Sequence, residues 1–204
     1  MTSRNTNSKY LFALAMVFVL FFVTVLPVQA KGNIPGLDSF IMSVQNGDAN
    51  ALRGVYVKNV MAYPVVQQPS GYAGYVSTDE KVVTQFGMAA AVGNIGLLAH
   101  DNLAGSAFPS LVEGDVVVMI YGDGHTEKFQ VTRIYKYQAL NPFSPTSSFK
   151  DLDSNVTISA EELFRLVYRG DRHVTFQTCI EANGNLSWGR LFVVAEPIED
   201  GASS

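Results

Sequence analysis

From Arg53 onward, the chain consists of short runs of β-forming residues that glycine and proline interrupt every few positions. Residues 55–57 and residues 65–66 are the first of these runs, and Pro64 and Gly71 are among the interruptions. Several short strands separated by turn residues are typical of a β-barrel or a β-sandwich. The sequence therefore predicts a mainly β domain with a few short helices.

The first 30 residues have a different character from the rest of the chain. Two basic residues precede an apolar run over residues 10–26, and Val28 and Ala30 are the small residues that a signal peptidase recognises. Cleavage before Lys31 is the first interpretation. The alternative is an uncleaved membrane anchor over residues 10–28, because an apolar stretch of about 20 residues can span a bilayer. Both interpretations predict an extracytoplasmic protein, secreted or anchored at the outer face of the cytoplasmic membrane.

Composition limits the number of domains and the class of partner. With 204 residues, of which 48 % are hydrophobic, the chain can bury one sizeable core. Without Arg4 and Lys9, the 14 basic residues fall to 12 against 18 acidic ones, which argues against nucleic acid as a partner. We expect residues 31–52 to form a linker and a short helix, residues 53–197 the β domain, and residues 198–204 a polar tail.

Local signals predict several elements inside the β domain. Ser159 and Glu162 have the spacing of a capping box, which predicts a helix that Gly170 ends. A brief helix is expected over residues 84–91. The expected strands cover residues 97–100, 116–121, 128–137, 173–180 and 188–195, with a hairpin turn at residues 122–124 and a bulge near Ile134, which is out of step with the alternation.

Cys179 is the only cysteine of the chain. Exported proteins normally use cysteines in pairs as disulfides, so a single one needs an explanation. It can be a small buried hydrophobic residue, it can form a disulfide with another chain, or it can be a catalytic nucleophile.

The last two strands predict which side chain faces Cys179. A hairpin turn centred on residues 184–185 pairs Cys179 with Arg190, and directly opposed residues project to the same face of a sheet. A nearby cation favours the thiolate, and a guanidinium can also bind the oxyanion of an attacked carbonyl group. Arg169 and Arg172 are two other arginines that could lie near Cys179, but the strand pairing favours Arg190.

Acyl transfer also needs a proton donor for the leaving amine, and histidine is the usual candidate. His125 follows a tight turn, where a solvated polar residue is expected. His173 precedes Cys179 by six residues on one strand, which separates them by about 20 Å at ~3.3 Å per residue. By elimination, the best candidate is His100, at the end of an apolar strand.

These residues resemble a known family. The segment Thr-Phe-Gln-Thr-Cys at residues 175–179 resembles the Thr-Leu-x-Thr-Cys signature of sortases, with Arg190 in the position of their downstream arginine. Residues 97–100 and the segment that follows, through Phe108 and Gly114, are similar to the sortase histidine strand, short helix and Gly-Asp turn. The resemblance covers roughly residues 54–197.

The sequence departs from the commoner sortase pattern in three places. Phe176 replaces a leucine, Asp101 follows the histidine, and residues 141–170 form a long connection that contains a helix. A helix before the cysteine strand is similar to the arrangement in class B sortases, where this connection helps to bind the sorting signal. These three departures bear on the sortase subclass that the sequence resembles, and not on the chemistry that the resemblance implies.

The resemblance implies a closed eight-stranded β-barrel and a cysteine transpeptidase. In such an enzyme, Cys179 attacks a sorting peptide of the Leu-Pro-x-Thr-Gly type and forms a thioacyl intermediate, which an amine of the cell wall or of a pilin resolves. His100 protonates the leaving amine, and Arg190 holds the carbonyl group or the oxyanion. The sequence predicts no cofactor and no metal site, and does not indicate whether calcium is required. The substrate-binding residues expected on this basis are Thr175, Thr178 and Asn102.

Two other functions fit parts of the sequence. L,D-transpeptidases are also exported enzymes with Cys and His, but they carry Ser-x-Gly-Cys with an arginine almost adjacent, and Glu181 and Ala182 do not match that pattern. The alternative from a different class is a non-catalytic, or purely hydrolytic, surface barrel that binds peptides, with Cys179 merely packed.

Overall fold

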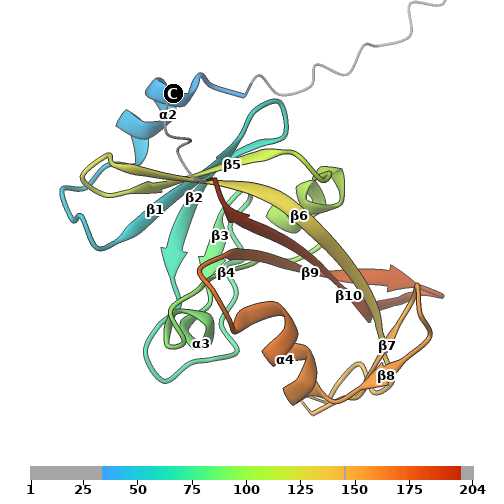
Figure 1. The fold of residues 1–204 in the computed structure, drawn as a ribbon. Helices are drawn as coiled ribbons and strands as arrows, with labels where there is room; N and C mark the ends of the chain where they lie inside the picture. Colours follow the sequence, from blue (N-terminus) through green and yellow to red (C-terminus); the bar gives the residue numbers. More distant parts are fainter. Residues whose placement is uncertain (1–33, 145, 199–204) are drawn as a thin grey trace, which may run out of the picture. The chain divides into compact units, whose positions relative to one another are not determined.

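The computed structural model describes residues 34–144 and 146–198, drawn as a ribbon in Figure 1. The predicted signal or anchor, and most of the predicted polar tail, lie outside the described residues. No helix within the described ranges is long and apolar enough to cross a membrane. The strands are β1 (Leu52–Val57), β2 (Met61–Gln67), β3 (Val83–Gln85), β4 (Ile95–Leu98), β5 (Val116–Tyr121), β6 (Thr126–Ala139), β7 (Phe149–Asp151), β8 (Thr157–Ile158), β9 (Val174–Ala182) and β10 (Asn185–Pro197). The helices are α2 (Leu37–Val44), α3 (Gly87–Ala90), the 3-10 helix η1 (Ala104–Ser110) and α4 (Ala160–Tyr168).

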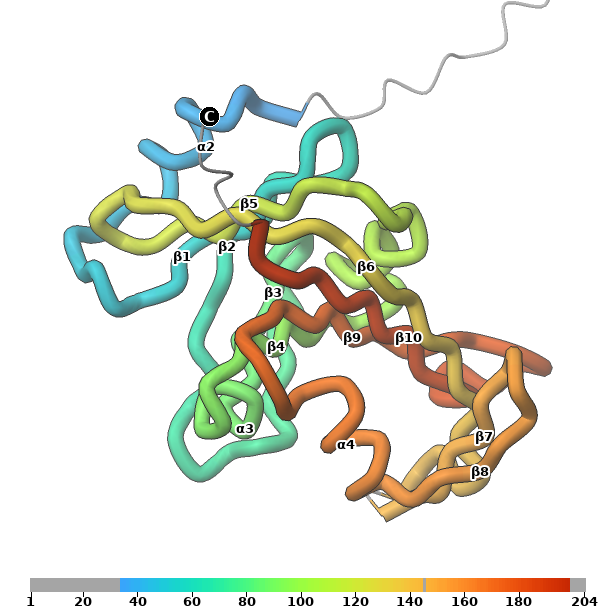
Figure 2. The backbone as a smooth tube through the Cα atoms, viewed as in Figure 1, coloured from blue at the N-terminus to red at the C-terminus, as the bar shows by residue number. Residues whose placement is uncertain are grey.

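Eight of the strands close into a barrel. Neighbours pair in the order β10, β9, β4, β3, β2, β1, β5, β6, and β6 pairs back with β10. Figure 2 shows the long β6 and β10 running side by side where the barrel closes. The pairs β2–β3 and β4–β9 are parallel, and β7 and β8 extend the sheet beyond β6. The closed eight-stranded barrel is therefore confirmed, and the sandwich is excluded.

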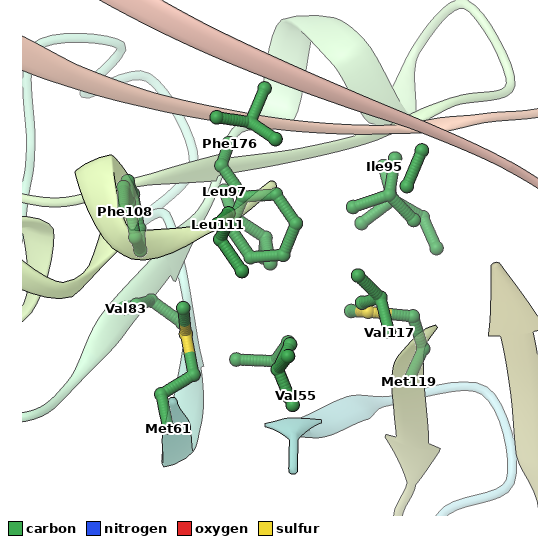
Figure 3. Packing of buried hydrophobic residues seen from close by; sticks show 14 of the residues in the cluster. Val55, Met61, Val83, Ile95, Leu97, Phe108, Leu111, Val117, Met119 and Phe176 are labelled. Atoms are coloured by element: carbon green, nitrogen blue, oxygen red, sulfur yellow. The ribbon is translucent and has the colours of Figure 1, made fainter. Parts of the chain in front are cut away.

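The barrel interior is filled by apolar side chains that alternate along the strands (Figure 3). Val55 and Val57 point inward from β1, and Phe176 points inward from β9 to meet Phe108 of η1 edge to face, with 5.1 Å between the ring centroids. Removing this apolar surface from water is the main contribution to the stability of the fold. The side chains that alternate with them on β9, at Thr175, Gln177 and Cys179, therefore face the outside of the barrel.

A bulge in β6 accounts for the interrupted alternation in the sequence. Val194 pairs with Arg133 and Ala195 pairs with Val131, so Thr132 has no partner on β10. The extra residue resets the alternation, and Val131 and Ile134 both pack on the barrel core. The bulge predicted near Ile134 is confirmed, two residues earlier in the chain.

The helix α4 covers part of the outer face of the barrel. The predicted capping box is present: the Ser159 hydroxyl accepts a hydrogen bond from the Glu162 amide, and the Glu162 carboxylate accepts one from the Ser159 amide. The apolar face of the helix, including Tyr168, packs against Tyr137 of β6 and Phe192 of β10. The long connection before β9 is therefore attached beside the strands that carry Cys179 and Arg190.

One prediction about local structure was wrong, and two short strands were missed. The helix expected over residues 84–91 covers only Gly87–Ala90, because Thr84 lies in β3, where it pairs with Val66 and Leu98. Strands β7 and β8 were not predicted, since most of their side chains are polar, β7 pairs with the distant end of β6, and β8 pairs only with β7. In both cases, contacts with distant strands outweigh local preference.

Candidate active site

Cys179 of β9 and Arg190 of β10 are direct cross-strand partners. Their side chains therefore project to the same side of the sheet, the outer face of the barrel that also carries Gln177. Both residues are partly buried. The pairing of Cys179 with Arg190 that the sequence predicts is confirmed.

The turn of the β9–β10 hairpin lies one residue earlier than the sequence predicts. Asn183 and Gly184 form the turn, with φ angles of 54° and 73°, as a two-residue type I′ turn requires. This turn pairs Asn185 with Ala182. If that register continued along the two strands, Trp188 would lie opposite Cys179 in place of Arg190.

A bulge in β10 moves the register by two residues. Between the pairs Asn185–Ala182 and Gly189–Ile180, three residues of β10 lie opposite the single residue Glu181 of β9. The shift keeps every later side chain on its original face, because two residues are one full period of a strand. The residues of this bulge are Leu186, Ser187 and Trp188.

The bulge holds the guanidinium of Arg190. Nη1 of Arg190 donates to the carbonyl oxygen of Ser187 at 3.0 Å and to that of Gly189 at 2.8 Å. Nε and Nη2 make no hydrogen bond with the described part of the chain, so they can meet a substrate oxygen. Gly189 is buried, and a Cβ atom there would lie 2.5 Å from the carbonyl oxygen of Tyr137. Only glycine lets β10 rejoin β6 at this point.

His100 follows the last pairs of the parallel strands β4 and β9. Leu98 pairs with Gln177, and the amide of Ala99 continues the ladder by donating to the Gln177 carbonyl oxygen at 3.2 Å. β4 ends at Leu98, so His100 is the second residue beyond the last pair between β4 and the cysteine strand β9. The His100 side chain is exposed, and its carbonyl oxygen accepts hydrogen bonds from the amides of Leu103 and Gly105.

The other two histidines are engaged elsewhere. His125 stacks on Tyr121, with 4.2 Å between the ring centroids, in the β5–β6 hairpin. This hairpin lies at the far end of β6 from Tyr137, the partner of Arg190. The ring nitrogens of the buried His173 lie 2.7 Å and 3.0 Å from the carbonyl oxygens of Asp171 and Val167. His100 is therefore the histidine that follows the strand next to β9 and has an exposed side chain, and its acid–base role stays a prediction.

The surroundings of Cys179 favour the neutral thiol. Burial is the largest effect and raises the pKa of the thiol, whereas the charge of Arg190 lowers that pKa. Asp101 raises the pKa, and a hydrogen bond with the Ser187 side chain lowers it. The net result is a pKa above the ordinary cysteine value. Arg190 thus lowers the pKa of the thiol, as expected, but the effect of burial is larger. The thiol must therefore lose its proton during attack.

No protein-family model matches the sequence, and no curated protein is significantly similar to it. The fold is similar to solved sortase structures. Sortase A of Listeria monocytogenes has a TM-score of 0.48 at 14 % identity, over 74 % of this chain and 89 % of that one. Sortase A of Corynebacterium diphtheriae has a TM-score of 0.49 at 14 % identity, over 86 % and 74 %. Sortase C-1 of Actinomyces oris has a TM-score of 0.48 at 14 % identity, over 83 % and 84 %. Similarity at this level assigns no activity.

The predicted substrate-binding threonines are occupied by internal hydrogen bonds. The Thr178 hydroxyl is buried and donates to the carbonyl oxygen of Ala99 at 2.9 Å, and the Thr175 hydroxyl is buried and donates to that of Val167 at 2.5 Å. Thr178 therefore fixes the residue before His100, and Thr175 fixes the end of α4, and their role in substrate binding stays a prediction. Asn102 is exposed in the turn after His100, and its role stays a prediction.

Ser187 is a residue of the site that the sequence reasoning missed. The signal for it was the Asn-Gly turn at Asn183 and Gly184, which pairs Asn185 with Ala182. Starting from this turn, Cys179 and Arg190 can lie opposite each other only if β10 has two more residues than β9 between the turn and this pair. Within residues 34–144 and 146–198, no group of three or more His, Cys, Asp or Glu side chains is arranged to bind a metal ion.

Proposed function

We propose that the chain is an exported cysteine transpeptidase of the sortase type. The observation that carries the proposal is the direct pairing of Cys179 with Arg190, beside the strand end that leads to His100. The three groups supply a nucleophile, a binder of developing negative charge and an acid–base group. The sequence resemblance at residues 175–179 supports the same reaction.

In the first half-reaction, the Cys179 sulfur attacks the carbonyl carbon of the scissile peptide bond while His100 accepts the thiol proton. The neutral resting thiol makes this proton acceptor necessary. The negative charge that develops on the carbonyl oxygen is met by Nε and Nη2 of Arg190, while Nη1 stays bound to the bulge. The C–N bond then breaks, His100 gives its proton to the leaving amine, and a thioacyl enzyme remains.

In the second half-reaction, an amine attacks the thioacyl carbon and gives a proton to His100. The C–S bond breaks, and the thiol recovers a proton from His100, which restores the resting state. We propose a sorting peptide of the Leu-Pro-x-Thr-Gly type as the first substrate and an amine of the cell wall or of a pilin as the acceptor. Hydrolysis of the same intermediate is the closest alternative reaction, with water in place of the amine.

The decisive experiment is incubation of the full chain with a set of sorting-type peptides, with and without amines, followed by mass spectrometry. We expect a thioacyl adduct on Cys179, and a new amide product when an amine is present. The Cys179→Ala variant serves as the control and should give neither species. Binding of the peptides without an adduct on any of them would overturn the proposal in favour of a non-catalytic barrel.

A further inference from the structure

The bulge of β10 decides which side chain faces the nucleophile. The turn at Asn183 and Gly184 starts a register that leads to Trp188 opposite Cys179, whereas the bulge brings Arg190 to that position. Bulges that redirect a side chain are common beside active sites. This bulge lies between the turn and Arg190, the cross-strand partner of the only cysteine of the chain.

The bulge is held by hydrogen bonds of its own. The amide of Ser187 donates to Oδ1 of Asn185 at 2.9 Å, which fixes the first half of the bulge. The carbonyl oxygen of the same Ser187 accepts a hydrogen bond from Arg190 Nη1 at 3.0 Å. The amide and the carbonyl oxygen of one residue therefore link the Asn185 side chain to the Arg190 guanidinium, and its hydroxyl lowers the pKa of a third group, the thiol of Cys179.

We infer that Ser187, held in the bulge by Asn185, is a positioning residue that fixes the Arg190 guanidinium opposite the Cys179 thiol. A long arginine side chain loses much rotational freedom when it is held in one geometry. The carbonyl oxygens of Ser187 and Gly189 meet this cost before substrate arrives, because both accept a hydrogen bond from Nη1 and leave Nε and Nη2 available to a substrate oxygen. The Ser187 hydroxyl adds a donor that stabilises the thiolate as it forms.

The inference extends the proposed function. It rests on that proposal for one point, the role of Arg190 in binding negative charge beside Cys179. Its test needs no peptide substrate, because the pH dependence of Cys179 alkylation reports the thiolate directly. The rate of reaction with iodoacetamide is measured by mass spectrometry from pH 6 to pH 10 for the full chain and its variants. A failed peptide assay would therefore leave this test intact.

Asn185→Ala and Ser187→Ala address the two halves of the inference. Without the Asn185 acceptor, the Ser187 carbonyl oxygen is no longer fixed and Arg190 keeps only its contact with Gly189, so alkylation at neutral pH should slow by about three- to tenfold, the value of one hydrogen bond. Arg190→Ala should slow it by at least as much, and Asn185→Ala should have no further effect in the Arg190→Ala background. Ser187→Ala should also move the midpoint of the pH profile upward, and Ser187→Thr, which keeps a hydroxyl, should restore it.

Asn183→Gly is the matched control in the same hairpin, because glycine tolerates the positive φ of this turn residue and the midpoint should not change. Ser187 is only partly buried, so its variants remain informative if Asn185→Ala does not fold. The inference is overturned if Asn185→Ala and Ser187→Ala lower the melting temperature but leave the midpoint unchanged. Additive effects of Asn185→Ala and Arg190→Ala would likewise contradict it.

Discussion

Cys179 lies directly opposite Arg190 because β10 carries two more residues than β9 between the hairpin turn and this pair. Cross-strand partners are held in place by the backbone ladder, so the relation between thiol and guanidinium does not depend on a flexible loop.

Arg190→Lys should lower kcat/KM for peptide cleavage by about 10²-fold, the cost of losing a donor to an oxyanion. Lysine lacks the planar fork that binds the two bulge carbonyl oxygens and a substrate oxygen at the same time. Arg169→Lys, at an exposed position after α4, is the control and should keep the wild-type rate. A wild-type rate for Arg190→Lys would remove Arg190 from the site.

His100→Ala should lower the rate of thioacyl formation by about 10²- to 10⁴-fold, the usual contribution of an acid–base group. The exposed position of His100 predicts little change in melting temperature. Stopped reactions analysed by mass spectrometry give the rate. His125→Ala changes a histidine of the distant β5–β6 hairpin and should leave the rate unaltered. Equal losses for the two variants would contradict the assignment.

Asp101→Asn should make Cys179 more reactive. Asp101 raises the pKa of the thiol, so its neutralisation lowers that pKa and increases the thiolate fraction at every pH below it. Because burial keeps the wild-type pKa above the ordinary cysteine value, the wild-type alkylation rate should still be rising in the alkaline range. We expect an increase of about threefold at pH 7, as for a partly screened charge. A slower reaction of Asp101→Asn would show that Asp101 acts otherwise than through its charge.

Thr178→Val should destabilise the protein by about 1–2 kcal/mol, because it leaves the buried carbonyl oxygen of Ala99 without this donor. Urea unfolding measures the loss. The variant should also lower kcat, since Ala99 precedes His100, whereas Thr178→Ser should retain both stability and rate. If the serine variant is as impaired as the valine variant, the methyl group rather than the hydroxyl is what matters at this position.

Local signals in the sequence were sufficient where the interaction partners are close in the chain. The capping box of Ser159 and Glu162, the strand β5 and the turn before β6 all depend on residues a few positions apart. The pairing of Cys179 with Arg190 was only partly predictable from such local signals. Its partners were predicted correctly, but the turn was placed one residue too late and the bulge was missed.

Residue types and spacing by themselves determined that the chain is mainly β and made Cys179, Arg190 and His100 the candidate site residues, whereas the bulge of β10 decided that Cys179 and Arg190 lie opposite each other. Only the tertiary structure decided the closure of β6 on β10, the inward direction of the Thr178 hydroxyl and the dominance of burial over Arg190 in the pKa of the thiol. These features arise from strands far apart in the sequence. Register between such strands is set by packing and by bulges, which no local pattern of residues records.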